Sequence, residues 1–156
     1  MKIADILDAR GVLPQLKATT KKQVLQDISQ HLAVIVAVDK RIIFETLFTR
    51  EKLGSTGLGQ GIAIPHGRIA GLGKVTGLFA KLATPIAYDA VDGQPVDLVF
   101  ALLSPDHAGA DHLTALAKIS RIMRSPAAVS KLRATNTAEG LYAVLTEPIV
   151  VATAAA

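Results

Sequence analysis

The sequence predicts a single α/β domain in which helices cover both faces of a mixed β-sheet. A chain of 156 residues with 50% hydrophobic content suits one domain with an ample core. Residues 96–103, VDLVFALL, are almost continuously apolar, which is typical of a central strand covered on both faces. Apolar residues spaced three and four apart recur on both sides of this stretch and indicate amphipathic helices. Strands that alternate with helices define the α/β class.

The N-terminal residues combine a short helical turn with an extended segment. Residues 3–7 are expected to form the helical turn, which Gly11 would close. Residues 12–16 contain Pro14, which cannot donate a hydrogen bond to a neighbouring strand. We therefore expect this segment to be an edge strand or an extended connection.

Two helices are predicted next. Thr20 is a suitable N-cap for an amphipathic helix over residues 21–38. Asp39 can cap a second helix over residues 40–52, and Gly54 is placed to end it.

The segment before the central strand is predicted to contain a turn and two extended pieces. Residues 69–74 form the turn, and residues 75–82 form a strand. Residues 84–88 are expected to be a second, shorter piece, because Pro85 marks an edge or a break. The pair Asp92-Gly93 is a strong turn signal before the central strand.

Three helices are predicted after the central strand, which Pro105 stops. Their expected ranges are residues 111–124, a short helix that Pro126 begins, and a last helix that Thr137 caps. Residues 147–156 have no periodicity and are expected to fray.

The most unusual segment, residues 50–68, reads REKLGSTGLGQGIAIPHGR. Glycines this dense are costly in a helix or strand, so they indicate left-handed backbone or a close approach to a ligand. Pro65 pushes the residue before it toward extended geometry. This predicts a short strand over residues 62–64 that delivers His66 at its end.

This arrangement suits phosphate chemistry. A neutral imidazole is a good nucleophile near pH 7, and glycine-rich turns can direct several backbone N–H groups at one anion. A nucleotide site is disfavoured because neither G-x-x-x-x-G-K-[ST] nor G-x-G-x-x-G is present. Spacing alone leaves open that the glycines form a tight connection and that His66 is an ordinary loop histidine. The candidate phosphate-loop residues are Gly54, Ser55, Thr56, Gly57, Gly59, Gly61 and Gly67.

The charge balance invites a nucleic-acid interpretation that the distribution of charge opposes. Seventeen basic and thirteen acidic residues leave a net charge of +4. The basic residues are scattered among the predicted helices, and 4% aromatic content is too low for a base-stacking platform. We therefore expect solvated helix faces and no nucleic-acid partner.

Cysteine content and hydropathy constrain the setting of the protein. The absence of cysteine excludes disulfides, thiol catalysis and cysteine-ligated zinc, and it fits a reducing compartment. No apolar run approaches the roughly 20 residues that span a bilayer. The N-terminus also lacks the long apolar core of a secretion signal. We expect a cytoplasmic protein without membrane insertion.

His107 and His112 do not make a convincing metal pair. Five positions on a helix place two side chains on different faces, and the H-E-x-x-H spacing is absent. We expect no metal and no other cofactor. His112 lies near a predicted helix start, where the positive end of the helix dipole would lower its pKa and favour the neutral imidazole. Such an imidazole can donate one N–H to a phosphoryl oxygen.

Residues 50–68 resemble the active-site segment of the IIA proteins of the bacterial phosphoenolpyruvate-dependent phosphotransferase system, in its fructose/mannitol group. Residues 84–105, TPIAYDAVDGQPVDLVFALLSP, and residues 111–121, DHLTALAKISR, continue the resemblance in the same order. The likeness covers about residues 1–146, which we expect to be the IIA domain. It is closest to the nitrogen-regulatory members, and it implies a three-layer fold.

The resemblance implies roles for three side chains. The histidine of the IPHG segment, His66, would take a phosphoryl group from a phosphorylated HPr-like carrier, and the resemblance implies Nε2 as its acceptor atom. His112 matches a second histidine beside the site, and Arg50 matches an arginine that faces it. In-line transfer of this kind needs positioning and charge stabilisation more than acid–base chemistry.

The resemblance leaves two functions open. A regulatory IIA protein would act on target proteins, here unidentified, according to its phosphorylation state. A sugar-specific IIA component would instead pass its phosphoryl group to the IIB domain of a membrane transporter. No IIB-like segment or membrane span accompanies the sequence, which favours the regulatory alternative.

Overall fold

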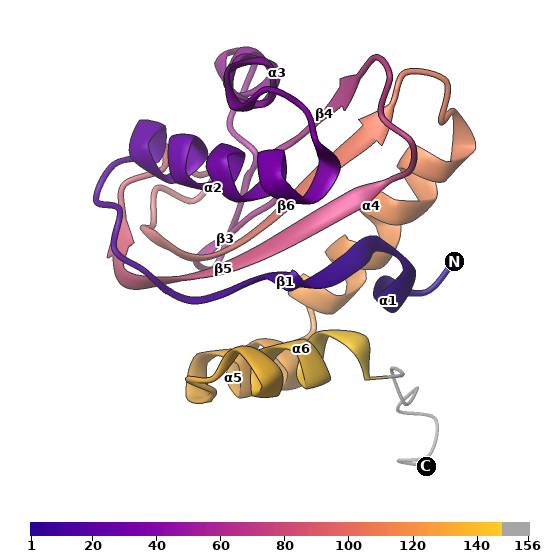
Figure 1. Cartoon of the computed structure of the whole chain (residues 1–156). Helices are drawn as coiled ribbons and strands as arrows, with labels where there is room; N and C mark the ends of the chain where they lie inside the picture. Colours follow the sequence, from indigo (N-terminus) through magenta and orange to yellow (C-terminus); the bar gives the residue numbers. More distant parts are fainter. Residues whose placement is uncertain (148–156) are drawn as a thin grey trace.

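The computed structural model describes residues 1–147, and these residues form one α/β domain around a single sheet (Figure 1). The strand order is β1-β5-β6-β3-β2, and β4 pairs with β6 beside this path. Apart from Glu147, the tail expected to fray lies outside the described residues. The strands are β1 (Leu7–Leu16), β2 (Gly57–Gly59), β3 (Ile62–Ala63), β4 (His66–Ile69), β5 (Thr76–Ile86) and β6 (Val96–Pro105). The helices are α1 (Ile3–Ile6), α2 (Lys21–Val36), α3 (Lys40–Lys52), α4 (Ala110–Met123), α5 (Pro126–Ala134) and α6 (Ala138–Thr146).

The apolar strand β6 lies at the centre of the sheet, as the sequence predicts. It pairs antiparallel with β5 and parallel with β3 and β4. Its side chains alternate between two cores, because successive residues of a strand point to opposite faces. Val99 and Ala101 belong to one core, whereas Leu98 and Phe100 belong to the other.

Helices cover both faces of this sheet and complete the three layers. Helices α2 and α3 lie over one face, and α4, α5 and α6 lie over the other (Figure 1). Each layer of helices presents an apolar stripe to its own side of β5 and β6. Within residues 1–147 no helix is both long enough and apolar enough to cross a membrane.

Side-chain caps start the helices where the sequence predicts. The hydroxyl of Thr20 accepts a hydrogen bond from the backbone N–H of Gln23 at 3.1 Å. The carboxylate of Asp39 accepts one from the N–H of Arg41 at 2.8 Å. Helix α2 ends at Val36, two residues before the predicted end, because Ala37 adopts a left-handed conformation.

The prediction that Gly11 closes the N-terminal helical turn was wrong. Helix α1 ends at Ile6, and β1 starts at Leu7 and continues through Gly11. A Cβ at Gly11 would lie 3.2 Å from the carbonyl oxygen of Gly77, so the glycine permits a close backbone approach to β5. The edge position expected from Pro14 is confirmed, since β1 is the outermost strand.

The two extended pieces predicted around Pro85 form one strand, so the predicted break was wrong. Strand β5 is continuous from Thr76 to Ile86. Its pairing with β6 shifts register between Lys81 and Ile86, and Pro85 is exposed in this irregular part. A proline is tolerated there because the ladder is already interrupted.

The prediction that His66 ends a strand was also wrong. Strand β3 ends at Ala63, and His66 is the first residue of β4, opposite Leu102. Both strands follow β6 in parallel, and the carbonyl of Pro65 accepts a hydrogen bond from the N–H of Leu102 at 2.9 Å between them. Pro65 has no N–H, so the ladder is interrupted one residue before the histidine.

Candidate functional site

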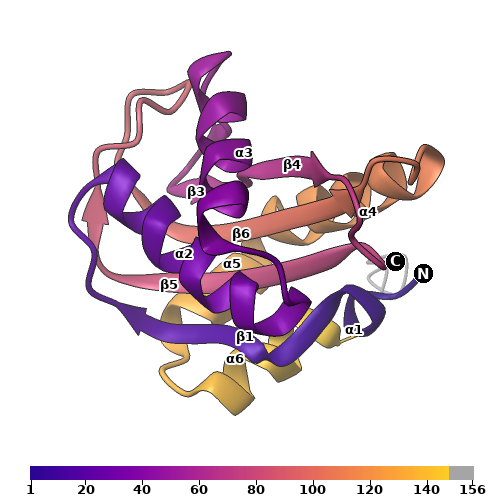
Figure 2. The ribbon, with the colours of Figure 1, turned by 45° about the horizontal axis from the view of Figure 1, so that its top comes forward.

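His66 lies where β4 passes beneath α3. Helix α3 packs on β4 (Figure 2), and a Cβ at Gly67 would lie 2.5 Å from the methyl carbon of Thr46 in that helix. A side chain at position 67 would therefore push the helix away from the strand. Gly67 allows the close approach that sets His66 beside the end of α3.

A backbone hydrogen bond fixes the orientation and the tautomer of His66. Its Nδ1 lies 2.8 Å from the carbonyl oxygen of Ile64. A carbonyl oxygen only accepts, so Nδ1 carries the proton and donates, and in the neutral ring Nε2 keeps its lone pair. Nε2 is therefore the nucleophilic atom of His66.

The environment of His66 lowers its pKa below the ordinary value of 6.5. Burial of the half-exposed ring has the largest effect, and the positive charge of Arg50 lowers the pKa further. The hydrogen bond to Ile64 and the charge of Glu51 act in the opposite direction. The neutral imidazole is thus the dominant form near pH 7.

His112 is the neighbour of His66 on the other side of the site. It is the third residue of α4, and its ring centre lies 5.8 Å from that of His66 with the planes tilted by 52°. Burial lowers its pKa most, followed by the charges of Arg68 and His66. The lowered pKa agrees in direction with the expectation from the helix start, but its main cause is burial. The Nδ1 atom lies 2.6 Å from the hydroxyl oxygen of Ser104.

Arg50 approaches from the last turn of α3. Its Nη1 donates a hydrogen bond to the carbonyl oxygen of Gly54 at 2.8 Å, and its charge acts on His66. The structure therefore places Arg50, His66 and His112 around one surface site, although they come from α3, β4 and α4.

The Ser-Thr pair of the glycine-rich segment is engaged within the protein. The buried carboxylate of Glu51 accepts hydrogen bonds from both the N–H and the hydroxyl of Thr56, with the N–H at 2.8 Å. The hydroxyl of Ser55 donates to the carbonyl oxygen of Tyr88 at 3.1 Å. These contacts attach the segment to α3 and to Tyr88, which lies just after β5. They also engage both the N–H and the hydroxyl of Thr56.

The glycines of the segment serve packing and turns. A Cβ at Gly57 would lie 2.8 Å from the Cβ of Ala90, and one at Gly59 would meet the carboxylate of Asp92. Gly61 lies against Arg133 and Asp97, at the end of β3 away from His66. A phosphoryl group at Gly59 or Gly61 would face a carboxylate, and Gly57 is packed against Ala90, so we do not include these three glycines in the proposed site.

Sequence reasoning missed four groups that act on the site. They are the carbonyl of Ile64, the carboxylate of Glu51, the guanidinium of Arg68 and the hydroxyl of Ser104. Ser104 left a signal, because it is the polar residue that follows the apolar run of β6. Its contact with His112 depends on tertiary packing, which the sequence pattern does not give.

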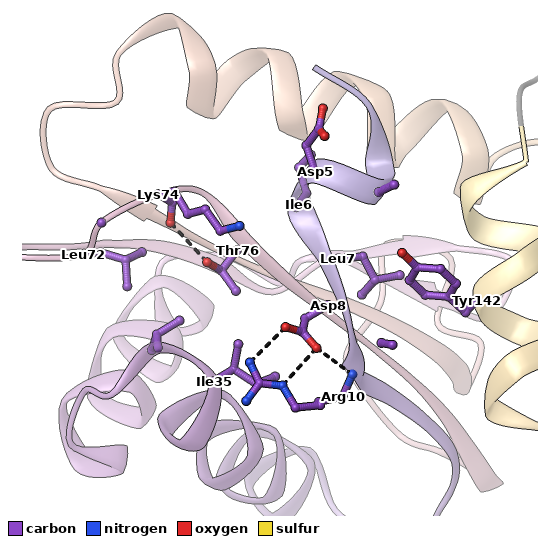
Figure 3. A pocket seen from close by; sticks show the side chains of 14 residues that line it. Asp5, Ile6, Leu7, Asp8, Arg10, Ile35, Leu72, Lys74, Thr76 and Tyr142 are labelled. Carbon is purple, nitrogen blue, oxygen red and sulfur yellow. Dashed lines mark hydrogen bonds and ion pairs between the residues drawn. The ribbon is translucent and has the colours of Figure 1, made fainter.

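A cleft of about 550 Å³ lies elsewhere, between β1, the end of α2 and the turn before β5 (Figure 3). Asp8 and Arg10 line it and pair with each other at 2.9 Å. The hydroxyl of Thr76 donates to the carbonyl of Lys74 at 3.1 Å in the same cleft. Neither His66 nor His112 reaches it. Residues 1–147 contain no group of three or more histidine and acidic side chains that could hold a metal ion.

Comparison with known proteins assigns the chain to a family. The model of the family described as "Phosphoenolpyruvate-dependent sugar phosphotransferase system, EIIA 2" matches residues 5–147. The chain therefore belongs to the EIIA type 2 family of the phosphoenolpyruvate-dependent sugar phosphotransferase system.

Within this family, the chain is more similar to nitrogen regulatory proteins than to a sugar-specific protein. The chain is 49% identical to a nitrogen regulatory protein of Bradyrhizobium diazoefficiens over 95% of this chain and 97% of that protein. It is 39% identical to a nitrogen regulatory protein of Klebsiella oxytoca over 94% of this chain and 91% of that protein. The crystal structure of the nitrogen regulatory protein IIA-Ntr from Neisseria meningitidis superposes with a TM-score of 0.88 at 39% identity, over 92% of this chain and 99% of that one.

Sugar-specific proteins are less similar. The fructose-specific EIIABC component of Bacillus subtilis is 30% identical over 79% of this chain, which spans 20% of that longer protein. The likeness to the nitrogen regulatory proteins is stronger and extends over nearly their whole length.

Proposed function

We propose that this protein is a nitrogen-regulatory IIA protein of the cytoplasm that accepts a phosphoryl group on Nε2 of His66 from an HPr-like carrier. Residues 1–146 would form the phosphoryl-accepting domain. The observation that carries the proposal is the hydrogen bond from Nδ1 of His66 to the carbonyl of Ile64. It leaves Nε2 as a free nucleophile in a ring whose lowered pKa keeps it neutral.

The transfer step requires no metal or external base. The lone pair of Nε2 attacks the phosphorus of the carrier's phosphohistidine, and the P–N bond of the carrier breaks as the new P–N bond forms. The electron pair of the broken bond returns to the carrier's nitrogen. Nδ1 of His66 keeps its proton and its hydrogen bond to Ile64 throughout, so the step needs no proton transfer. Positioning and charge stabilisation therefore supply the catalysis.

His112 and Arg50 supply that stabilisation. The charge on a transferring phosphoryl group is spread over its oxygens, which favours positively charged groups and N–H donors held in place beforehand. The ring of His112 is buried and fixed by Ser104, and Arg50 is tethered by the carbonyl of Gly54. Both groups are therefore held near His66 before the carrier arrives.

The surroundings of the histidine pair suit a protein donor. Leu113 follows His112 directly, and its side chain is 66% exposed. Single exposed apolar residues are common on protein surfaces, so Leu113 is included only because it directly follows His112 in α4. A carrier that covers Leu113 would exclude water from the reacting histidine.

The regulatory role follows from the charge of the product. A phosphohistidine adds about two negative charges to the surface beside Leu113, which repels partners that dock there when the site is unphosphorylated. The similarity to nitrogen regulatory proteins supports this role. Pull-downs with unphosphorylated wild type, phosphorylated wild type and His66→Ala should give different partners for the two wild-type forms. Identical partner sets would contradict the regulatory proposal.

The second candidate function is transfer to a IIB domain of a sugar transporter, which the similarity to the fructose-specific component supports. The two functions differ in where the phosphoryl group goes next. Phosphorylated protein should keep its phosphoryl group in the presence of a fructose-type IIB domain if the role is regulatory. Rapid loss to the IIB domain would favour the sugar-specific function.

Reconstitution tests the donor and the acceptor together. The protein is incubated with phosphoenolpyruvate, enzyme I and each candidate carrier in turn, and its intact mass is measured. The wild type should gain one phosphoryl group only when a carrier is present, whereas His66→Ala should gain none and remain folded. Phosphorylation of His66→Ala would contradict the assignment of the acceptor.

A further inference from the structure

Within residues 1–147, the hydroxyl of Ser104 is the only hydrogen-bond partner of the ring of His112. Ser104 is fully buried in β6, and its Oγ lies 2.6 Å from Nδ1 of His112, whose residue is 6% exposed. In the sheet, Ser104 is paired with Arg68, two residues beyond the pair formed by His66 and Leu102. Strand β6 therefore both pairs with His66 and carries Ser104, the residue that contacts His112.

The position of one proton follows from the burial of this pair. If Nδ1 of His112 carried the proton, it would donate to Oγ, and the hydroxyl proton of Ser104 would have no acceptor within residues 1–147. A buried donor without an acceptor is unfavourable. If the hydroxyl donates to an unprotonated Nδ1, both groups are satisfied. Every buried side-chain nitrogen and oxygen in the described part of the chain has a partner in either arrangement, so the choice between the two rests on the hydroxyl proton of Ser104.

We propose that Ser104 is a positioning residue that holds His112 as the Nε2–H tautomer, so that His112 can donate a hydrogen bond to the phosphoryl group on His66. This inference rests on the proposed function, because it assumes that His66 is phosphorylated. Ser104 itself does not touch the phosphoryl group. It acts by keeping the lone pair of His112 on the buried Nδ1 and the proton on Nε2, because an unprotonated Nε2 would repel phosphoryl oxygens.

The tautomer is measurable without any phosphoryl transfer. Nitrogen-15 NMR of the imidazole rings in the unphosphorylated protein distinguishes a protonated from an unprotonated ring nitrogen. The wild type should show His112 with the proton on Nε2 and His66 with the proton on Nδ1. A wild-type His112 protonated on Nδ1 would overturn the proposal directly, whatever the variants do.

Variants then connect the tautomer to the transfer rate. Ser104→Ala should give His112 a mixture of tautomers and slow phosphoryl transfer to His66 several-fold. Ser104→Thr keeps a hydroxyl in a strand that tolerates β-branched residues, and it should restore the Nε2–H form and part of the rate. The matched control is Ser29→Ala, because Ser29 is also buried and its hydroxyl also makes one 2.6 Å hydrogen bond, to the carbonyl of Leu25 in α2. This control should change neither the tautomer nor the rate.

A double variant separates positioning from general structural damage. In a His112→Ala background, Ser104→Ala should cause no further loss of rate, because its effect passes through the missing ring. An equal loss in both backgrounds would overturn the positioning role, as would an unchanged tautomer in Ser104→Ala. A wild type that accepts no phosphoryl group at all would instead overturn the proposed function, since the tautomer measurement does not depend on transfer.

Discussion

Two hydrogen bonds to ring nitrogens give the histidine pair its chemistry. The carbonyl of Ile64 accepts a hydrogen bond from the Nδ1–H of His66 and leaves Nε2 as a nucleophile, whereas Ser104 contacts Nδ1 of His112. The two rings therefore differ in role although their centres are 5.8 Å apart. Burial lowers the pKa of both rings, which prevents two positive charges from facing each other.

The lowered pKa of His66 makes phosphoryl acceptance dependent on pH. Only the neutral ring has a free lone pair, so the transfer rate should be constant above pH 6.5 and fall once the pH drops through the folded-state pKa, below 6.5. NMR titration of His66 in the folded protein gives this pKa independently of the carrier. A pKa above 6.5 would show that burial and Arg50 do not dominate.

Replacement of His112 tests its role as a donor. His112→Ala should still accept a phosphoryl group on His66, but roughly 30- to 160-fold more slowly, because one positioned donor is worth about 2–3 kcal/mol at a developing negative charge. His112→Gln keeps an N–H at similar reach and should recover part of the rate. Quench-flow measurements give the rates, and thermal melts check folding. Wild-type rates in both variants would leave His112 with a structural role alone.

Two adjacent residues at the end of α3, Arg50 and Glu51, have different roles. Arg50 directs its charge toward His66, whereas Glu51 turns inward and holds Thr56 of the glycine-rich segment. The sequence predicts this helix, its Asp39 cap and its end near Gly54 correctly. It could not predict that Glu51 is buried, because the partners of this carboxylate are a backbone N–H, a hydroxyl and Lys21 at 3.7 Å, brought together only by the fold.

Removing the charge of Glu51 should weaken the attachment of the segment to α3. Glu51→Gln retains the shape but loses charge-assisted hydrogen bonds from Thr56, so the free energy of unfolding should fall by about 1–3 kcal/mol. Chemical denaturation measures the difference. Glu45→Gln, at an exposed position of the same helix, is the matched control and should change stability by less than about 0.5 kcal/mol. Equal effects of the two substitutions would contradict the role given to Glu51.

The start of α4 should decide how well the carrier docks. Leu113→Glu places a charge on the exposed apolar side chain beside His112, and it should raise the carrier concentration needed for half-maximal transfer about 10-fold, equivalent to ~1.4 kcal/mol. The rate at saturating carrier should change little. Val34→Glu is the control, because Val34 is 75% exposed but lies on α2, on the other face of the sheet. Equal effects of the two charges would argue against docking at α4.

At the scale of the whole molecule, the sheet brings the site together. Strand β6 pairs with β3 and β4 and is followed by α4 (Figure 2). His66 at the start of β4 and His112 near the start of α4 are thereby brought side by side. The class, the layers and the central strand are all predictable, because they follow from apolar patterns along the chain. The start of β4 at His66 is not predictable from the sequence. Pro65 suggests that the strand ends there, whereas in the structure the chain continues beside β6 on both sides of Pro65.

The acceptor atom of His66 tests the central claim most directly. The protein is labelled with nitrogen-15 in histidine, phosphorylated through phosphoenolpyruvate, enzyme I and the carrier, and examined by phosphorus–nitrogen correlation NMR. Because the protonated Nδ1 of His66 donates to the carbonyl of Ile64, the phosphorus should couple to Nε2 of His66. Coupling to Nδ1 of His66, or to a nitrogen of any other histidine, would contradict the account.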